Sequence, residues 1–380
     1  MYRICLVTGS RAEYGIMKPL IERLVDDLEI RLDIIATAMH MEEKYGFTYQ
    51  VIEEDGYSIF RKIPISLEDT SKKTVVHSIS ALQLALINLF EEVVYDLIII
   101  LGDRYEMLAV ANVALIYNIP VCHLHGGEKT LGNFDEYIRH AITKMSHLHL
   151  AATDEYKNRI LQMGEEPERV VNTGALGVEN VLKIPKLSKD DLSNQLTISL
   201  PDSYYVILFH PVTLDEEQSA LVQVKELLAA LDQISVPCIF IGSNSDTGSD
   251  LIMSAIEDYV AIHKNCHLFK SLTTQQYHSL ILYSKGLVGN SSSGLIEVPS
   301  LKRPTLNIGN RQKGRLHGGS VIDVSCEQTE IFKGLKRLDS IKDFSNPYEQ
   351  EDSSLKAYCK IKEFLHDGTT TLKDFQDIRW

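Results

Sequence analysis

The stretch Asp96–Gly127, DLIIILGDRYEMLAVANVALIYNIPVCHLHGG, decides the fold class. Two apolar runs, Asp96–Leu101 and Ile119–Leu124, flank a helical pattern over Glu106–Tyr117. Continuous apolar runs are typical of parallel strands that are covered on both faces. The order strand, helix, strand is that of a βαβ unit. We therefore predict an α/β fold with a parallel sheet and helices on both of its faces.

The alternation of strand and helix patterns extends outward in both directions. Strands are predicted before the central unit at Arg3–Thr8 and Leu32–Thr37, and after it at Leu148–Ala152. A second series of strands and helices runs through residues 205–308. Because 380 residues exceed what one hydrophobic core usually holds, we predict two Rossmann-like, doubly wound domains that face each other across a cleft.

The domain limits follow from changes in composition. The segment Pro185–Pro201 is polar and bracketed by prolines, and we interpret it as the connection between the domains. The N-terminal domain is expected to span residues 1–184 and the C-terminal domain residues 185–350. Residues 351–380 are expected to form a helix and a mobile end that pack back toward the N-terminal domain.

Composition excludes several classes of function. The formal net charge of -14 argues against a nucleic-acid-binding protein. No apolar run approaches the roughly 20 residues of a membrane span, and no signal-peptide pattern opens the chain. The six cysteines lack metal-ligand or disulfide spacing, and the first strand–helix turn is not a dinucleotide fingerprint. A soluble protein of the reducing cytoplasm, without a zinc site or an NAD site, is expected.

Acid and base side chains gather after the strand Ile119–Leu124. The stretch His123–His140, HLHGGEKTLGNFDEYIRH, holds several histidines and carboxylates, and Asp103 follows the preceding strand. Carboxyl ends of parallel strands form the crevice in which ligands bind, so proton-transfer chemistry is one interpretation. A solvated loop followed by a capped helix is the other, and the two have equal weight.

A second set of polar groups lies at other strand ends. The stretch Gly289–Gly294, GNSSSG, joins a strand to a helix and offers hydroxyl and backbone N–H groups to a phosphate. Other charged or polar groups that follow strands are Arg11, His210, Glu297, Arg311 and Arg315. A serine-rich helix cap and a solvated loop are each the commoner outcome. The polar and charged residues named above nevertheless share one edge of a sheet, and this shared position favours a diphosphate site.

An ordered set of motifs resembles the hydrolysing UDP-N-acetylglucosamine 2-epimerases, most closely the bacterial enzymes of sialic acid biosynthesis. The likeness covers roughly the first 330 residues, and its specificity lies in the order of the motifs. The motifs are GSRAEYG at 9–15, GDR at 102–104, HLHGGEKT at 123–130, DEYIRHAITKMSHLH at 135–149, FHPVT at 209–213, GSNSDTGSD at 242–250, GNSSSGLIEVP at 289–299 and NIGNRQKGR at 307–315.

The resemblance implies the glycosyltransferase-B architecture and a specific reaction. UDP-GlcNAc would lose its C2 proton and then UDP, which gives 2-acetamidoglucal, and water would add to give N-acetylmannosamine. The resemblance implies UDP-GlcNAc and UDP as ligands, no cofactor, and a homo-oligomer, either a dimer or a tetramer.

Residue roles carry over from the resemblance motif by motif. Asp103 and Asp135 match the acid/base carboxylates. Many family members have a catalytic glutamate where this chain has His125, so His125, Glu128 or a water would take that role. Residues matching UDP contacts are Arg11, Arg104, His210, Asn244, Ser291, Ser292, Glu297 and Arg311. Sugar-side or supporting residues are His40, His123, Glu136, Arg139 and His147.

Four other functions remain open from the sequence. The same reaction could act on UDP-2,4-diacetamido-2,4,6-trideoxyglucose for legionaminic acid, or UDP could be retained as in a non-hydrolysing epimerase. A glycosyltransferase on the same fold is a third alternative, because fold alone does not determine function. A non-catalytic UDP-sugar sensor is the fourth.

Overall fold

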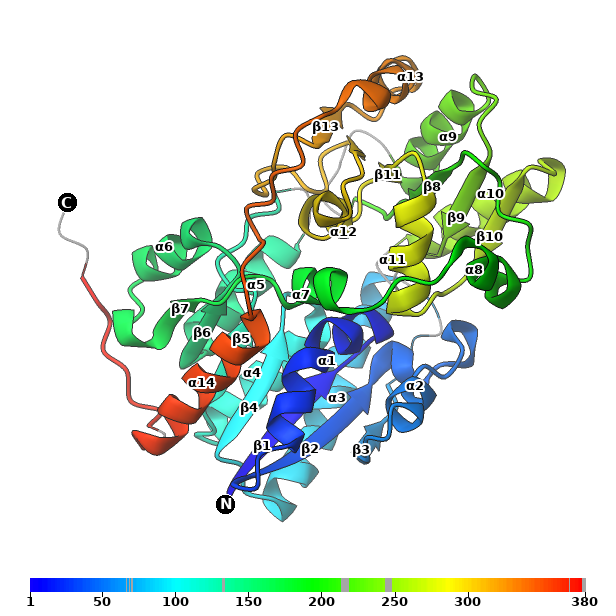
Figure 1. The fold of residues 1–380 in the computed structure, drawn as a ribbon. Helices are drawn as coiled ribbons and strands as arrows, with labels where there is room; N and C mark the ends of the chain where they lie inside the picture. Colours follow the sequence, from blue (N-terminus) through cyan, green and yellow to red (C-terminus); the bar gives the residue numbers. More distant parts are fainter. Residues whose placement is uncertain are drawn as a thin grey trace.

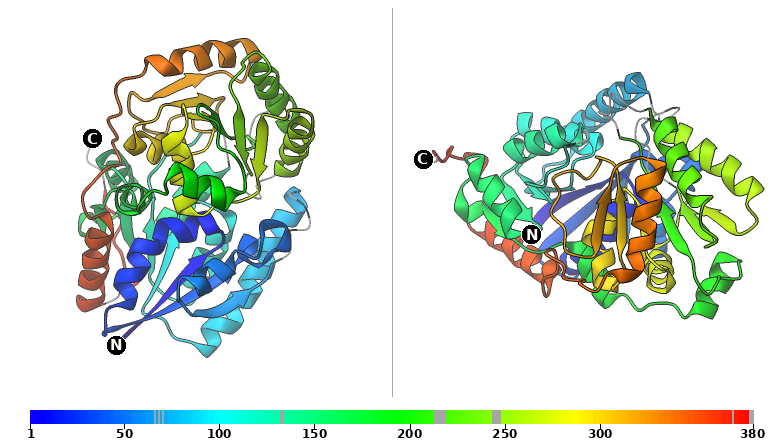
Figure 2. Two further views of the ribbon diagram at one scale, coloured as in Figure 1. Left: turned by 45° about the vertical axis from the view of Figure 1, so that its right-hand side comes forward. Right: turned by 90° about the horizontal axis from the view of Figure 1, so that it is seen from above.

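A computed structural model describes residues 1–65, 67, 69, 71–131, 134–212, 219–242, 248–368 and 370–377. Within these ranges the chain forms two parallel sheets with helices on both faces (Figure 1). The two sheets lie in separate halves of the molecule (Figure 2). The predicted α/β class and the two doubly wound domains are confirmed.

The first sheet belongs to the N-terminal half. Its strands are β1 (Tyr2–Thr8), β2 (Ile30–Thr37), β3 (Ile59–Ile63), β4 (Leu97–Leu101), β5 (Val121–Leu124), β6 (Leu148–Ala151) and β7 (Val170–Asn172). Its helices are α1 (Arg11–Val25), α2 (Tyr49–Glu54), α3 (Lys72–Glu92), α4 (Tyr105–Ile116), α5 (Asp135–Met145), α6 (Asp154–Gln162) and α7 (Leu176–Lys183). The strand order β3-β2-β1-β4-β5-β6-β7 reverses between β1 and β4, which is where such sheets bind ligands.

The second sheet repeats this plan. Its strands are β8 (Tyr205–Leu208), β9 (Cys238–Ile241), β10 (Cys266–Phe269), β11 (Leu287–Gly289), β12 (Thr305–Ile308) and β13 (Val321–Val324). Its helices are α8 (Lys189–Leu196), α9 (Ala220–Leu231), α10 (Ser249–Ile262), α11 (Thr274–Tyr283), α12 (Ser293–Ile296) and α13 (Gln328–Arg337). The order β10-β9-β8-β11-β12-β13 reverses between β8 and β11.

Side chains of the central strands are buried on both faces of each sheet. In β1, Cys5 and Val7 pack into the core beneath α3 and α4, whereas Ile4 and Leu6 pack into the core beneath α1. A strand that is buried on both faces has no polar face, so it is continuously apolar in sequence. The apolar runs therefore indicated the central strands correctly.

The last helix, α14 (Ser353–His366), returns to the N-terminal half and packs beside α1 (Figures 1 and 2). Tyr358 Oη donates to Asp27 Oδ2 at 2.7 Å. Beyond the helix, Lys373 Nζ donates to the backbone oxygens of Lys144 and Ser146, both at 2.7 Å. The expected mobile end is thus anchored as far as these contacts reach.

Several elements differ from the sequence prediction. The polar segment Pro185–Pro201 contains helix α8, whose Leu192 and Leu196 are buried in the core next to α11. Two apolar residues one turn apart are too weak a periodic signal among polar neighbours. Strands β7 (VVN) and β13 (VIDV) are short and only partly buried, so neither forms a continuous apolar run in the sequence.

Candidate active site

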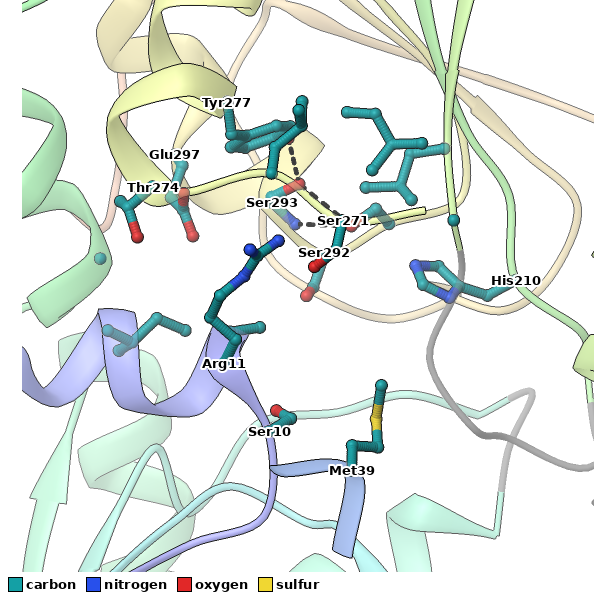
Figure 3. A pocket seen from close by; sticks show the side chains of 18 of the residues that line it. Ser10, Arg11, Met39, His210, Ser271, Thr274, Tyr277, Ser292, Ser293 and Glu297 are labelled. Atoms are coloured by element: carbon teal, nitrogen blue, oxygen red, sulfur yellow. Dashed lines mark hydrogen bonds between the residues drawn. The ribbon is translucent and has the colours of Figure 1, made fainter. Parts of the chain in front are cut away.

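A cavity separates the two halves at the carboxyl ends of both sheets (Figure 3). The polar and charged residues that line it are Ser10, Arg11, Tyr45, Thr48, Asn180, His210, Lys270, Ser271, Thr274, Tyr277, Ser291, Ser292, Ser293, Glu297 and Arg311. A second cavity continues from it, since Ser10, Ser292 and Arg311 line both. Together they form one cleft, which we describe as a nucleotide half and an acid/base half.

Close backbone packing shapes the nucleotide half. A Cβ atom at Gly289, which has φ +148°, would lie 1.9 Å from the Leu208 oxygen, so only glycine allows β11 to approach β8 there. Next to it, Asn290 accepts from the His210 N–H at 2.7 Å and donates to the His210 oxygen at 2.8 Å. This double hydrogen bond holds the ends of β8 and β11 together and places His210 at the cleft.

Three hydroxyls form a chain on the C-terminal side of the nucleotide half. Tyr277 Oη and Ser293 Oγ are 2.6 Å apart, and Ser293 Oγ and Ser291 Oγ are 3.0 Å apart (Figure 3). Ser292 lines the cleft beside them. These hydroxyls can each donate to or accept from an oxygen-rich ligand.

Guanidinium groups reach the same region from both domains. Arg11 extends from the start of α1 toward Ser292 and Ser293 (Figure 3). Burial lowers the pKa of Arg11 to about 10, so the group stays charged at neutral pH although it is poorly hydrated. Arg311 comes from the opposite domain and donates to the Asn290 oxygen at 3.2 Å. A diphosphate between these residues would be neutralised from two sides.

A carboxylate closes the other end of the nucleotide half. Glu297 Oε2 lies 3.1 Å from His278 Nε2, and its Oε1 lies 3.0 Å from the position of a Cβ at Gly177. Glu297 belongs to the C-terminal domain and Gly177 to α7, so the two domains lie close together here. A carboxylate here can accept hydrogen bonds from a ribose diol.

The acid/base half is lined by Asp103, which follows β4, and by Asp135, the first residue of α5. The fully buried Arg139 holds this half together, because it donates from Nε to Asp103 Oδ2 at 3.0 Å and from Nη1 to Glu136 Oε2 at 2.8 Å. It also donates to Thr130 Oγ1 at 2.6 Å. Asp103 is therefore fixed as a hydrogen-bond acceptor at the cleft.

A buried ion pair crosses between the domains behind this half. Arg315, from the loop after β12, lies 2.9 Å from Glu128 Oε2, and the other oxygen of Glu128 lies 2.8 Å from His125 Nδ1. Burial would raise the pKa of Glu128, but the Arg315 charge and the hydrogen bond to His125 outweigh it and lower the pKa to about 2. An ionised carboxylate only accepts, so His125 carries its hydrogen on Nδ1. Its Nε2 has no partner among the described residues.

The family model for UDP-N-acetylglucosamine 2-epimerase matches residues 22–362. The chain belongs to the UDP-N-acetylglucosamine 2-epimerase family. The polysialic acid biosynthesis protein P7 of Escherichia coli is 45% identical to it over 100% of this chain and 98% of that protein. The GDP/UDP-N,N'-diacetylbacillosamine 2-epimerase (hydrolyzing) of Campylobacter jejuni is 40% identical over 89% of this chain and 88% of that protein.

A solved structure supports the architecture of this 2-epimerase family member. The UDP-GlcNAc 2-epimerase of Neisseria meningitidis, crystallised with UDP-GlcNAc, matches with a TM-score of 0.79. Its sequence identity is 19%, and the match covers 95% of this chain and 100% of that chain. The predicted glycosyltransferase-B arrangement of two domains is confirmed.

Most of the predicted site residues of this 2-epimerase family member lie at the cleft. The residues expected to contact UDP that line the nucleotide half are Arg11, His210, Ser291, Ser292, Glu297 and Arg311. Arg104 instead lines the acid/base half, where Glu106 accepts two of its hydrogen bonds. Asn244 lies outside the described residues.

Two of the predicted histidines support the cleft from beneath. His40 is buried between Thr8 Oγ1 at 3.1 Å and Thr48 Oγ1 at 2.9 Å, and burial lowers its pKa to about 4. His123 Nε2 donates a hydrogen bond to the Gly102 oxygen at 2.7 Å, and burial lowers the pKa of His123 to about 3. Both are neutral at physiological pH and hold cleft-lining loops in place.

The sugar-side assignment of His147 is corrected. His147 stands just before β6, at the edge where the strands begin, and its Nδ1 accepts from the Val121 N–H at 3.2 Å. Active-site groups gather at the opposite edge. His147 directly precedes the strand predicted at Leu148–Ala152, which was a usable signal that it lies at the edge where the strands begin.

The structure also adds residues that the sequence analysis did not select. Glu13 lines the acid/base half, and Tyr277 and Asn180 line the nucleotide half. Arg315, expected only as a positive charge, is the cross-domain partner of Glu128. Glu13 lies two residues after Arg11 in the same turn, which was a usable signal. In the part of the chain that the structure describes, His, Cys, Asp and Glu form no group that could hold a metal ion.

Proposed function

We propose that this protein is a hydrolysing 2-epimerase that converts UDP-GlcNAc to N-acetylmannosamine and UDP in the cytoplasm, for sialic acid synthesis. The observation that carries the proposal is the continuous cleft, whose cationic half adjoins an acid/base half through Ser292 and Arg311. A sugar nucleotide needs both at once, with its phosphates in one half and the sugar C2 in the other. The 45% identity to a polysialic acid biosynthesis protein supports the same pathway class.

Arg11 and Arg311 would neutralise the diphosphate, so that UDP can leave C1 with the bonding electron pair. A C2 proton is weakly acidic, and its removal requires a base held close to it. We propose Asp103 as that base, because it lines the cleft and Arg139 orients it. Asp135 lines the same half, and His125 Nε2 is a buried acceptor without a partner among the described residues.

Glu128 is assigned a positioning role. Both of its oxygens are engaged, one by Arg315 and one by His125, and its lowered pKa keeps it ionised. A carboxylate in that state carries no proton to deliver. Glu128 therefore orients the His125 ring, which leaves Nε2 as an acceptor.

A second donor, UDP-2,4-diacetamido-2,4,6-trideoxyglucose, remains the alternative substrate. It is favoured by the 40% identity to a hydrolysing diacetylbacillosamine 2-epimerase. The nucleotide half would serve both donors equally, because they share UDP. The difference would lie at the sugar C4 and C6.

A proton NMR time course in deuterated water tests the proposal. Incubation with UDP-GlcNAc is expected to give free UDP and N-acetylmannosamine with deuterium at C2. A product that keeps UDP would indicate the non-hydrolysing reaction, and UDP release without C2 exchange would contradict epimerisation. A parallel incubation with the diacetamido donor compares the two substrates by turnover.

Replacing Arg311 with alanine is expected to weaken UDP binding about 10- to 100-fold. The loss corresponds to about 1.5–3 kcal/mol for a hydrogen bond to a charged group. Isothermal titration with UDP measures it. A matched change at the exposed Lys313, Lys313→Ala, removes a positive charge from the same loop and should leave the affinity unchanged. Equal affinities for wild type and Arg311→Ala would place Arg311 outside the UDP site.

We also propose that the protein is a homo-oligomer, joined through α3. By length and composition alone, this helix could cross a membrane. One of its faces, however, is buried in the domain core through Leu82 and Leu86. On another face Val76, Leu84 and Ile87 are exposed in one stripe. A second copy would cover this stripe.

The substitution Leu84→Glu is expected to give a monomer, because it places a charge in the centre of the α3 stripe. Leu84 is 66% exposed within the single chain, so the change should not disturb folding. Light scattering after gel filtration measures the mass. The control Leu28→Glu makes the same change at a residue that is 92% exposed outside the stripe. An unchanged mass for Leu84→Glu would contradict this interface.

A further inference from the structure

Glu13 is a carboxyl group at the acid/base half that the proposed reaction has not yet used. It is the third residue of α1, and its side chain lines the same cavity as Asp103 and Asp135. The residue is only 6% exposed. A buried carboxyl at the wall of a reaction cleft requires a chemical explanation, because burial of this group is costly without full pairing.

The pairing of Glu13 is incomplete. Its Oε2 accepts from the Gly9 N–H at 2.7 Å, whereas its Oε1 is buried and has no hydrogen-bond partner among the described residues. The nearest cation is Arg104, whose Nε lies 3.8 Å from Oε1. One oxygen is thus held in place, and the other is buried at the wall of the cleft without a hydrogen-bond donor.

Arg104 is engaged mainly by another carboxylate. Its Nε and Nη2 donate to the two oxygens of Glu106 at 3.1 and 2.7 Å, and Glu106 is fully buried. Two carboxyl groups therefore share one guanidinium, and the second of them, Glu13, has the poorer geometry.

The other charged or titratable groups around Glu13 do not compensate it. Asp103, at the end of β4, adds negative charge, and His40, packed below the turn, is neutral because burial lowers its pKa to about 4. Burial is the largest effect on Glu13 and raises its pKa to about 7, with Arg104 opposing the change and Glu106 adding to it. Near neutral pH, Glu13 carries a proton in a large share of molecules.

We propose that Glu13 is the proton donor of the hydration step. In this step the Oε1–H of Glu13 gives its proton to C2 of 2-acetamidoglucal, while the oxygen of a water molecule bonds to C1. The water loses one proton, which returns the Glu13 carboxylate to its acid form. Atoms and charge balance, and no cofactor is needed. This inference rests on the proposed function.

Asp103 acts as the base and Glu13 as the acid because the two carboxyl groups have different surroundings. Arg139 fixes Asp103 as an acceptor, whereas Glu13 lacks a strong donor on Oε1. Two carboxyl groups whose environments differ in this way separate into a base and an acid. Inversion at C2 needs such a pair, because the proton leaves from one face of the ring and arrives at the other.

The variant Glu13→Gln tests the inference. Its amide can still accept from the Gly9 N–H but cannot transfer a proton. We expect UDP release to continue while 2-acetamidoglucal accumulates, and the hydration of added glucal to fall by about 10²- to 10⁴-fold. Proton NMR detects the glucal, N-acetylmannosamine and UDP together. A purely structural role would slow release and hydration equally, and that result would overturn the inference.

Two further measurements complete the design. In wild type, the rate of glucal hydration should fall as the pH rises above about 7. The control Glu22→Gln, at an exposed position of α1, should keep the wild-type rate and the wild-type pH profile. Carbon NMR of protein labelled at the glutamate carboxyl, with Glu13 assigned through Glu13→Gln, should show a titration near neutral pH without any turnover. A titration in the ordinary range near 4 would overturn the inference.

Failure of the inference and failure of the proposed function give different results. If wild type releases no UDP from either donor, the proposed function is wrong, and the step assigned to Glu13 is withdrawn with it. If wild type forms N-acetylmannosamine and Glu13→Gln forms it at the same rate, only the role of Glu13 is wrong.

Discussion

Replacing Asp103 with asparagine is expected to lower turnover by about 10²- to 10⁴-fold, the usual range for loss of a general base. Asparagine has the same shape and can still accept from Arg139, so the loop after β4 should keep its conformation. It cannot take a proton from C2. The nucleotide half is built by other residues, so UDP affinity should remain unchanged.

The measurement is the initial rate of UDP release, together with deuterium exchange at C2 and a titration of UDP. The control Asp202→Asn makes the same change at a fully exposed residue of the C-terminal half. A rate within a few-fold of wild type would remove Asp103 from the acid/base set and transfer the role to Asp135 or His125. UDP binding by the wild type without any turnover of UDP-GlcNAc would instead favour the non-catalytic sensor.

Replacing Arg315 with glutamine is expected to lower the free energy of unfolding by about 3–5 kcal/mol at pH 7. Glu128 would then be left as a buried carboxylate without its cation. In wild type the pKa of Glu128 is lowered to about 2. A carboxyl with a lowered pKa stabilises the folded state above its ordinary pKa of about 4.3, and this stabilisation is lost as the pH falls toward 2. Without Arg315, burial dominates and the pKa of Glu128 rises.

The sign of the pH dependence is therefore reversed in this variant. The destabilisation of Arg315→Gln should be largest at neutral pH and should shrink as acid protonates Glu128. Urea unfolding at several pH values measures it. The double variant Arg315→Gln with Glu128→Gln should recover much of the loss, and Lys313→Gln in the same loop should behave as wild type. A loss that does not depend on pH would show that the ion pair is not its cause.

Much of the fold could be read from local patterns. The central strands were indicated because both of their faces are buried, as for Ile98 and Ile99 in β4, which makes them apolar without interruption. The turns were indicated by glycines at positions such as Gly102, whose φ of +75° disfavours other residues. Both signals depend only on neighbours in the chain, so they need no knowledge of the tertiary structure.

The candidate site was predictable only in part. The nucleotide half follows strand ends, so its place was expected from the order of strands and helices. The protonation states of the acid and base groups were not predictable, because they depend on contacts between segments that are distant in the sequence. Glu128 is ionised because of Arg315, and Glu13 tends to hold a proton because it is buried while Arg104 pairs mainly with Glu106. No local pattern records such pairings.

The amino-acid sequence was sufficient to establish the α/β class, the two-domain organisation, the strand ends that build the cleft, and the family resemblance. Only the tertiary structure decided how the strands order themselves in each sheet and that Arg315 crosses to Glu128. The reason is physical. Periodicity and turn chemistry act over a few neighbouring residues, whereas burial and charge pairing depend on groups that meet only after the two domains have folded and closed.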